Sequence, residues 1–123
     1  MQSIRIIALF AAMFAVVVGV KWFQADAKCA RAGRVLADIQ MGSERYARAS
    51  EILKNVNTIE ARYMRVRALF NDALTGRKPI GRRREMLQRA ESELERLQGV
   101  APGYRDVREF VNHFAMVKRR VKF

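Results

Sequence analysis

Cys29 and His113 are the side chains best suited to nucleophilic chemistry, and the chain has one residue of each type. A cysteine becomes a catalytic nucleophile when a histidine within hydrogen-bond reach takes its proton. Cys29 follows an apolar N-terminal stretch, whereas His113 lies near the C-terminus beside Phe114. A Cys–His pair would need these distant parts of the chain to meet. We expect ordinary packing or capping roles for both residues, and no catalytic site.

Three acidic residues, Glu91, Glu93 and Glu95, alternate along one predicted helix. Residues two apart on a helix point in different directions, so these carboxylates do not form the facing pair of general acid–base catalysis. A solvated helix face explains them. The sequence also lacks a glycine-rich phosphate loop, an acidic metal-binding loop and a Cys/His cluster. With no motif for chlorophyll, haem or quinone either, we expect no cofactor and no metal.

Basic side chains are the remaining candidates for a functional surface. Lysine and arginine number 24 against 12 acidic residues, a formal net charge of +12. The residues that we predict to bind a partner form two clusters: Arg77, Lys78, Arg82, Arg83 and Arg84, and Lys118, Arg119, Arg120 and Lys122. The second cluster can compensate the dipole at a helix C-terminus. Positive charge at a helix N-terminus is unfavourable, so Arg82 to Arg84 require a partner with carboxylates or phosphates.

An apolar stretch opens the chain. Ile6 to Val20 contains no charged residue, and the wider segment from Ile4 to Phe23 is interrupted only by Arg5 and Lys21. Twenty helical residues rise about 30 Å, the thickness of the hydrocarbon core of a bilayer. The predicted membrane-anchor residues are Ile6, Phe10, Phe14, Val18, Trp22 and Phe23. The last two suit the aromatic belt at a membrane–water interface.

A cleaved secretory signal is the alternative interpretation of this stretch. The basic start and the apolar run precede Ala25-Asp26-Ala27, which has the small-x-small pattern of a cleavage site. Because Met1 is still attached, we expect an uncleaved anchor. The predicted organisation is a transmembrane anchor over residues 1–27 and a basic extramembrane helical domain over residues 28–123.

The flanking charges predict the orientation. The basic residues Lys21, Lys28, Arg31 and Arg34 follow the apolar stretch, against Arg5 and the amino terminus before it. The positive-inside tendency therefore favours a cytoplasmic domain on a bacterial-type inner membrane. A signal-anchor insertion would place the same domain outside.

Apolar residues recur at helical spacing in the first half of the domain. One stripe, over residues 28–56, consists of Ala32, Val35, Ile39, Gly42, Tyr46, Ala49, Leu53 and Val56. Thr58 can cap a second helix. Its apolar face consists of Ile59, Tyr63, Val66, Phe70 and Ala73. The segment from Gly76 to Gly81 combines two glycines with Pro79 and ends this helix.

Two further helices are predicted in the second half. The first, from Arg82 to about Leu97, has an apolar side formed by Met86, Leu87, Ala90, Leu94 and Leu97. After a break from Gly99 to Gly103, a last helix beginning near Tyr104 should be a core element. Its stripe consists of Val107, Phe110, Val111, Phe114, Val117 and Val121. No long period-two alternation occurs, so we predict an all-α fold, one transmembrane helix followed by a small bundle of antiparallel helical hairpins.

Part of the domain resembles tetratricopeptide-like helical hairpins. The residues that carry the resemblance are Leu36, Ala37, Ala49, Leu53 and Val56, then Ala90, Leu94, Leu97 and Pro102. It covers about residues 35–104, but the connection at Gly76 to Gly81 exceeds the family's tight turn, and Gly33 replaces the usual opening aromatic. The resemblance implies a turn near Gly42-Ser43. The unbroken phase of the stripe through Gly42 favours one continuous helix, and this is our prediction.

These features favour a non-catalytic accessory subunit that docks onto a large membrane protein complex of a photosynthetic, respiratory or secretion type. The expected partners are other subunits of that complex and anionic lipid head groups. The alternative is a membrane-tethered basic module that binds nucleic acid or acidic proteins through its hairpins. Nucleic acid is the less expected partner, because the aromatic residues are not interleaved with the basic ones on one face. A free-standing adaptor is a further alternative.

Overall fold

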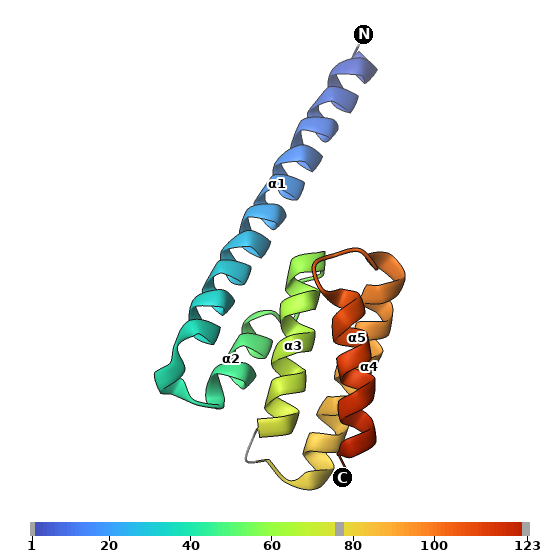
Figure 1. The fold of residues 1–123 in the computed structure, drawn as a ribbon. Coiled ribbons are helices and arrows are strands. Elements are labelled where there is room, and N and C mark those ends of the chain that lie inside the picture. The colour runs from blue at the N-terminus through green and yellow to red at the C-terminus, as the bar shows by residue number, and fades with distance from the viewer. Residues whose placement is uncertain (1, 76–77, 122–123) are drawn as a thin grey trace.

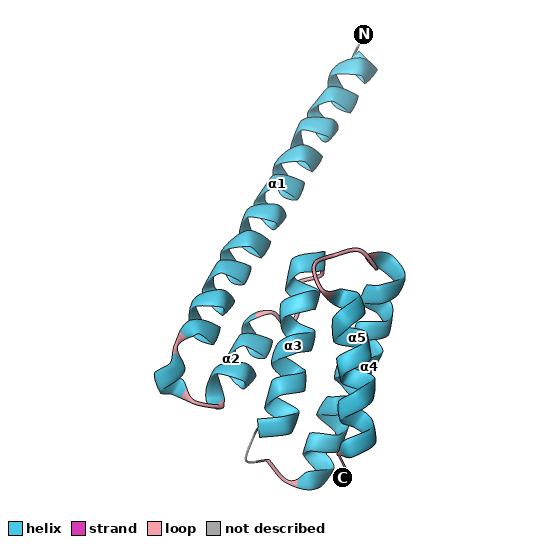
Figure 2. Cartoon of the chain, in the orientation of Figure 1, coloured by secondary structure: helices cyan, strands magenta, loops and turns pink. Residues whose placement is uncertain are grey.

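The computed structural model describes residues 2–75 and 78–121, apart from the side chains of Gln2, Ser3 and Val18. All regular elements in these residues are helical, as predicted; Figure 1 shows their arrangement and Figure 2 their secondary structure. The elements are the helices α1 (Gln2–Ala37), α2 (Glu44–Ile52), α3 (Ile59–Thr75), α4 (Ile80–Val100) and α5 (Val107–Arg120), and the 3-10 helix η1 (Ile39–Met41).

Consecutive helices are antiparallel neighbours, as short connections require. The C-terminal part of α1 packs on α2, α2 on α3, and α3 on α4, while α5 lies against α4 (Figure 1). The most extensive contact is between α3 and α4, which form the centre of the bundle. The apolar first part of α1 projects beyond the bundle, at the end where α3 begins and the α4–α5 loop lies (Figure 1).

The larger apolar cluster lies between α3, α4 and α5. Phe70 of α3 contacts Phe110 and Phe114 of α5, with ring centroids 5.2 and 5.0 Å apart. The apolar residues predicted for α4 are all buried: Met86, Leu87, Ala90, Leu94 and Leu97. The helical spacing therefore identified this part of the core correctly.

The smaller cluster joins α1, α2 and α3 through small side chains. It consists of Ala25, Cys29, Ala32, Ala49, Leu53, Val56, Ala61 and Ala68. Alanines at these positions allow the three helix backbones to approach closely, so that Leu53 becomes fully buried between them. The last third of α1 therefore belongs to the bundle, and the boundary predicted after residue 27 falls inside one continuous helix.

Residues 38–43 interrupt the helix predicted over residues 28–56. α1 ends at Ala37, the Asp38 carboxylate accepts a hydrogen bond from the Gln40 N–H, and Gly42 follows η1 with φ 64°. Ile39 and Gly42, which the stripe predicted to be apolar contacts, are exposed. The prediction of one continuous helix is wrong. The 3-10 helix η1 and the turn at Gly42 separate α1 from α2, although the three- and four-residue spacing of the stripe continues across them. The turn near Gly42-Ser43 that the tetratricopeptide-like spacing implies is present.

The other predicted helix boundaries are close to those observed. Thr58 accepts a hydrogen bond from the Ala61 N–H at 3.2 Å, which confirms the predicted cap of α3. α4 begins directly after Pro79, earlier than the predicted start at Arg82. α5 begins at Val107 rather than near Tyr104, because residues 101–106 turn the chain between the two helices.

Gly42→Ala is expected to lower the free energy of unfolding by about 1–3 kcal/mol. Gly42 combines φ 64° with ψ −143°, a conformation that is nearly restricted to glycine. An added Cβ meets no atom within 4 Å, so the loss comes from the backbone alone. Thermal unfolding followed by circular dichroism measures it.

Gly99→Ala is the matched control for that substitution. Gly99 lies in α4, where a Cβ also meets no atom within 4 Å, and alanine there should stabilise the domain by about 0.5 kcal/mol. If both variants are at least as stable as the wild type, the turn does not depend on the conformation of Gly42.

Candidate partner-binding surfaces

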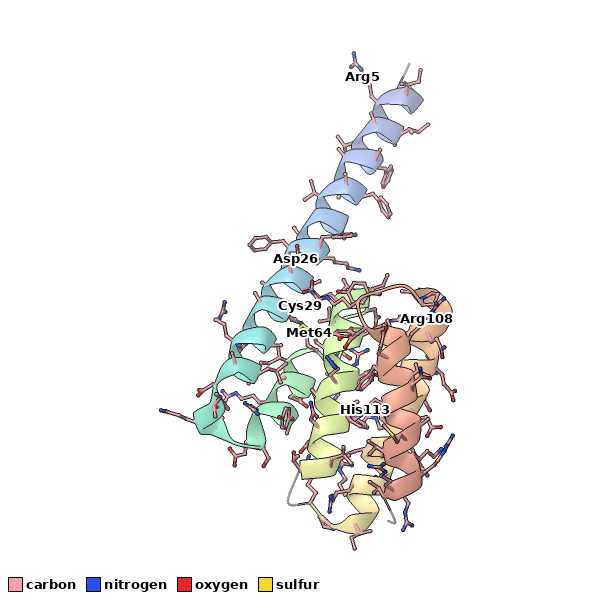
Figure 3. All side chains as sticks on the ribbon, in the orientation of Figure 1. Arg5, Asp26, Cys29, Met64, Arg108 and His113 are labelled. Carbon is pink, nitrogen blue, oxygen red and sulfur yellow. The ribbon has the colours of Figure 1, made fainter. Side chains whose placement is uncertain are left out.

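The two nucleophile candidates lie in different parts of the bundle. Cys29 is buried in the smaller cluster, whereas His113 is exposed on α5, with its ring centroid 5.8 Å from that of Phe70. Figure 3 labels both residues and shows them on different helices. The structure therefore does not bring them together. Within residues 2–75 and 78–121, no group of three or more His, Cys, Asp or Glu side chains could hold a metal ion.

Two of the three alternating acidic residues of α4, Glu91 and Glu93, bind neighbouring helices, which corrects the prediction of a solvated face for them. Glu93 accepts hydrogen bonds from Arg65 of α3 at 3.0 and 3.1 Å. Glu91 forms an ion pair with Lys118 of α5 at 2.8 Å. α4 lies between α3 and α5, so residues two apart on it face different neighbours. Only Glu95 is exposed as predicted.

Arg65 is a buried charged residue that the sequence did not reveal. Its Nη1 donates hydrogen bonds to the carbonyl oxygens of Leu53 and Val56 at 2.6 and 2.9 Å, while its Nε donates to Glu93. One guanidinium thus satisfies carbonyls that follow α2 and links them to α4. The signal that the sequence offers is the spread of apolar residues over several sides of residues 59–75, which indicates a helix enclosed by its neighbours.

Three arginines make the same kind of hydrogen bond, from a guanidinium to a backbone carbonyl near the end of the preceding helix. Each donates to a carbonyl nine residues earlier in the chain, in the last turn of the preceding α-helix or, for Arg65, in the segment that follows it. The pairs are Arg45 with Leu36, Arg65 with Val56, and Arg83 with Leu74. Leu36 and Leu74 lie in the last turns of α1 and α3, where carbonyls have no partner inside their own helix and a nearby cation is favourable. Part of the excess of arginine therefore stabilises the fold.

The first predicted basic cluster is partly engaged within the chain. Lys78 donates to the buried carboxylate of Asp72 at 3.1 Å. Arg83 donates to the carbonyl oxygens of Ala73 and Leu74 at 2.7 and 3.0 Å. The inference that Arg82 to Arg84 all require an outside partner is therefore wrong for Arg83, because the end of α3 supplies acceptors.

The remaining residues of the two clusters differ in what they contact. Arg82 lies 3.6 Å from Glu85 in an exposed pair, and Lys118 pairs with Glu91. Arg84, Arg119 and Arg120 are exposed to solvent. Arg77 and Lys122 lie outside the described residues.

The fold gathers the described members of the two clusters at one end of the bundle. α4 begins and α5 finishes at the end opposite to the α4–α5 loop, because the two helices are antiparallel (Figure 1). We call this the distal end and define it by Lys78, Arg82, Arg84, Arg119 and Arg120. Its exposed guanidinium groups can each bind a carboxylate or phosphate through two hydrogen bonds. The apolar part of α1 projects at the opposite end (Figure 1).

That opposite end is held together by a polar network. The Tyr63 hydroxyl donates a hydrogen bond to Asp106, and Arg67 donates to both residues, at 2.9 and 3.3 Å. Arg105, which has φ 44°, places its guanidinium 5.6 Å from the Tyr63 ring centroid. Burial and the bond to Asp106 raise the pKa of Tyr63 to about 12, and the same bond lowers the pKa of Asp106. The network fixes the α4–α5 loop on α3.

Tyr63→Phe is expected to lower the free energy of unfolding by about 1 kcal/mol at neutral pH, through loss of this hydrogen bond. The native state holds the phenol proton more tightly than the unfolded chain, in which tyrosine titrates near pH 10. This contribution is complete below pH 10 and is lost as the pH rises to about 12. Urea unfolding between pH 7 and 12 should therefore show a steeper decline for the wild type than for Tyr63→Phe, with Tyr46→Phe as the control. Parallel declines would contradict the assignment.

The predicted anchor residues are exposed along the apolar part of α1. Ile6, Phe10, Phe14, Trp22 and Phe23 are between 56% and 76% exposed. The side chain of Val18 lies outside the described part of the structure. From Ile4 onward α1 is long and apolar enough to cross a membrane, and none of its most apolar window is buried in the bundle.

The tetratricopeptide-like resemblance concerns the spacing of residues in α1, α2 and α4 and in the segments that follow α2 and α4. Antiparallel packing of consecutive helices agrees with hairpins of that general kind. Family membership needs sequence or structural similarity beyond spacing. No family model, no curated protein and no solved structure matches this chain.

Proposed function

We propose that this chain is a non-catalytic accessory subunit, held in a membrane by α1, that docks onto and stabilises a large membrane protein complex. One observation carries the proposal: α1 continues without a break from an exposed apolar segment into the core of a basic helical bundle. A bundle joined rigidly to its anchor presents one fixed surface to its neighbours. Such a geometry suits a structural part of an assembly better than a mobile tethered adaptor.

The junction between anchor and bundle supports retention of the apolar segment. Ala25, Cys29 and Ala32 belong to the smaller core cluster. Cleavage after Ala27 would remove Ala25 from that cluster and expose the side chains it covers. The same junction excludes a flexible linker between residues 24 and 37, because all of them are helical.

The distal end is the proposed docking surface for another subunit. Arg84, Arg119 and Arg120 are exposed there, on the side away from the apolar part of α1. Lipids of the membrane that holds α1 are therefore a poorer match for these residues than an acidic surface of a neighbouring protein. By the positive-inside tendency, the bundle is on the cytoplasmic side of a bacterial-type inner membrane.

A membrane-tethered module that binds nucleic acid is the second candidate, favoured by the net charge of +12. Single-stranded nucleic acid is bound by aromatic platforms beside basic grooves. Among the described residues, the exposed phenylalanine and tryptophan side chains are those of the apolar part of α1. The distal end thus offers charge without a stacking surface, which favours a protein partner.

Mild-detergent extraction of native membranes, size separation and mass spectrometry test the proposal. We expect this 14.2 kDa chain to migrate with a defined large complex and to stay there at high salt. Migration alone, or association with nucleic acid that moderate salt abolishes, would refute the accessory-subunit function and support the second candidate.

A further inference from the structure

Three segments meet where the apolar part of α1 ends. A cleft of about 880 Å³ separates α1 from the start of α3. Its walls are formed by Lys21, Trp22 and neighbouring residues of α1, by residues 55–60, and by Tyr104 of the α4–α5 loop. If α1 crosses a bilayer, the level of Lys21 and Trp22 is the level of the lipid head groups. The cleft and the α4–α5 loop are then at that level as well.

The side chains at this end of the bundle have the mixed character of an interfacial surface. We call it the proximal end and define it by Ile59, Val100, Tyr104 and Arg105. Val100 is 65% exposed and Ile59 39% exposed, so aliphatic groups face outward beside an aromatic ring and a guanidinium. Aromatic rings, aliphatic tips and long basic side chains are the types that settle between hydrocarbon and water.

The charges that line the cleft are of both signs. Lys21 and Lys28 face it from α1, together with Asp26, and Glu60 faces it from α3. A phospholipid head group offers a phosphate to the lysines, and an amine-bearing head group also offers a cation to the carboxylates. The apolar part of the lining includes Ile59 and Trp22, and Trp22 belongs to the exposed apolar part of α1.

We propose that the proximal end lies within the head-group layer of the membrane that holds α1, and that phospholipid head groups fill the cleft. This inference rests on the membrane anchor of the proposed function. It assigns the two ends of the bundle to different partners, phospholipid at the proximal end and protein at the distal end. α4 has 21 residues, so its two ends are separated by about 30 Å along the helix axis.

Single spin labels on the full chain in lipid nanodiscs test the inference. Cys29 is replaced by alanine, and one cysteine is introduced at Val100, Ile80 or Phe14. Val100 and Ile80 are the last and first residues of α4 and are similarly exposed, at 65% and 59%. Power saturation measures collision with oxygen, which enters lipid, and with a nickel chelate, which stays in water. We expect severalfold less nickel collision at Val100 than at Ile80, and the highest oxygen-to-nickel ratio at Phe14.

The other outcomes separate this inference from the proposed function. If labels at Val100 and Ile80 both collide frequently and equally often with the nickel chelate while the label at Phe14 lies in hydrocarbon, the inference is overturned and the membrane anchor stands. Equal shielding of Val100 and Ile80 also overturns it, because the bundle would then lie flat on the membrane. High nickel collision at Phe14 overturns the anchor and the inference together. A label at Ile59→Cys repeats the comparison, and circular dichroism checks that each variant is folded.

Discussion

Arg65→Met should lower the free energy of unfolding by about 3 kcal/mol, the low end of the range for breaking a buried ion pair. The substitution removes the hydrogen bonds to the carbonyl oxygens of Leu53 and Val56 and leaves Glu93 unpaired. The Glu93 side chain is 26% exposed and can regain some water, so the upper end of the range is not expected. Denaturant unfolding in mild detergent, followed by circular dichroism, measures the change.

Two further variants separate the contributions at Arg65. Glu93→Gln keeps an acceptor for Arg65 and should lose only about 1 kcal/mol, because the carbonyl bonds remain. Arg89→Met, on the exposed side of α4, should stay within about 0.5 kcal/mol of the wild type. If Arg65→Met is no less stable than Arg89→Met, the guanidinium does not hold the end of α2 in place.

The helical spacing of apolar residues predicted α3, α4 and α5, because the apolar residues that pack against neighbouring helices recur there with the period of the helix. Tyr63, Val66, Phe70 and Ala73 are buried as predicted, whereas Ile59, predicted on the same face, is exposed. The same spacing failed between α1 and α2. The stripe continues in phase across residues 38–43, although Ile39 is 79% exposed, so phase alone does not distinguish a helix from two helices joined by a matching turn.

The internal roles of the charged residues could not be predicted from the sequence. An arginine that caps a helix and one that faces solvent have the same local sequence character, and only the position of the next helix distinguishes them. Arg83 and Arg84 are adjacent in the chain, yet Arg83 binds the end of α3 and Arg84 is exposed. The sequence identified the basic clusters, and the fold determined which members are available to a partner.

Reversing three of the four exposed arginines of the distal end should release the chain from its complex. The variant Arg84→Glu/Arg119→Glu/Arg120→Glu leaves Lys78 and Arg83, which bind within the fold, unchanged. Repulsion from an acidic partner should reduce the co-migrating fraction by roughly tenfold or more at physiological salt, since like-charge contacts cost several kcal/mol. Size separation of extracts from cells that express each form measures this fraction.

A control variant with the same change in net charge decides whether position matters. Arg48→Glu/Lys54→Glu/Arg96→Glu reverses three exposed residues that lie outside the distal end. Because long-range attraction depends on the total charge whereas docking depends on local contacts, only the distal-end variant should leave the complex. Equal release of both variants would indicate binding through net charge alone, as expected for the nucleic-acid module. Retention of both variants in the complex would exclude the distal end as the docking surface. In a separate measurement, recovery of both variants in the membrane fraction would show that α1 anchors the chain independently of docking.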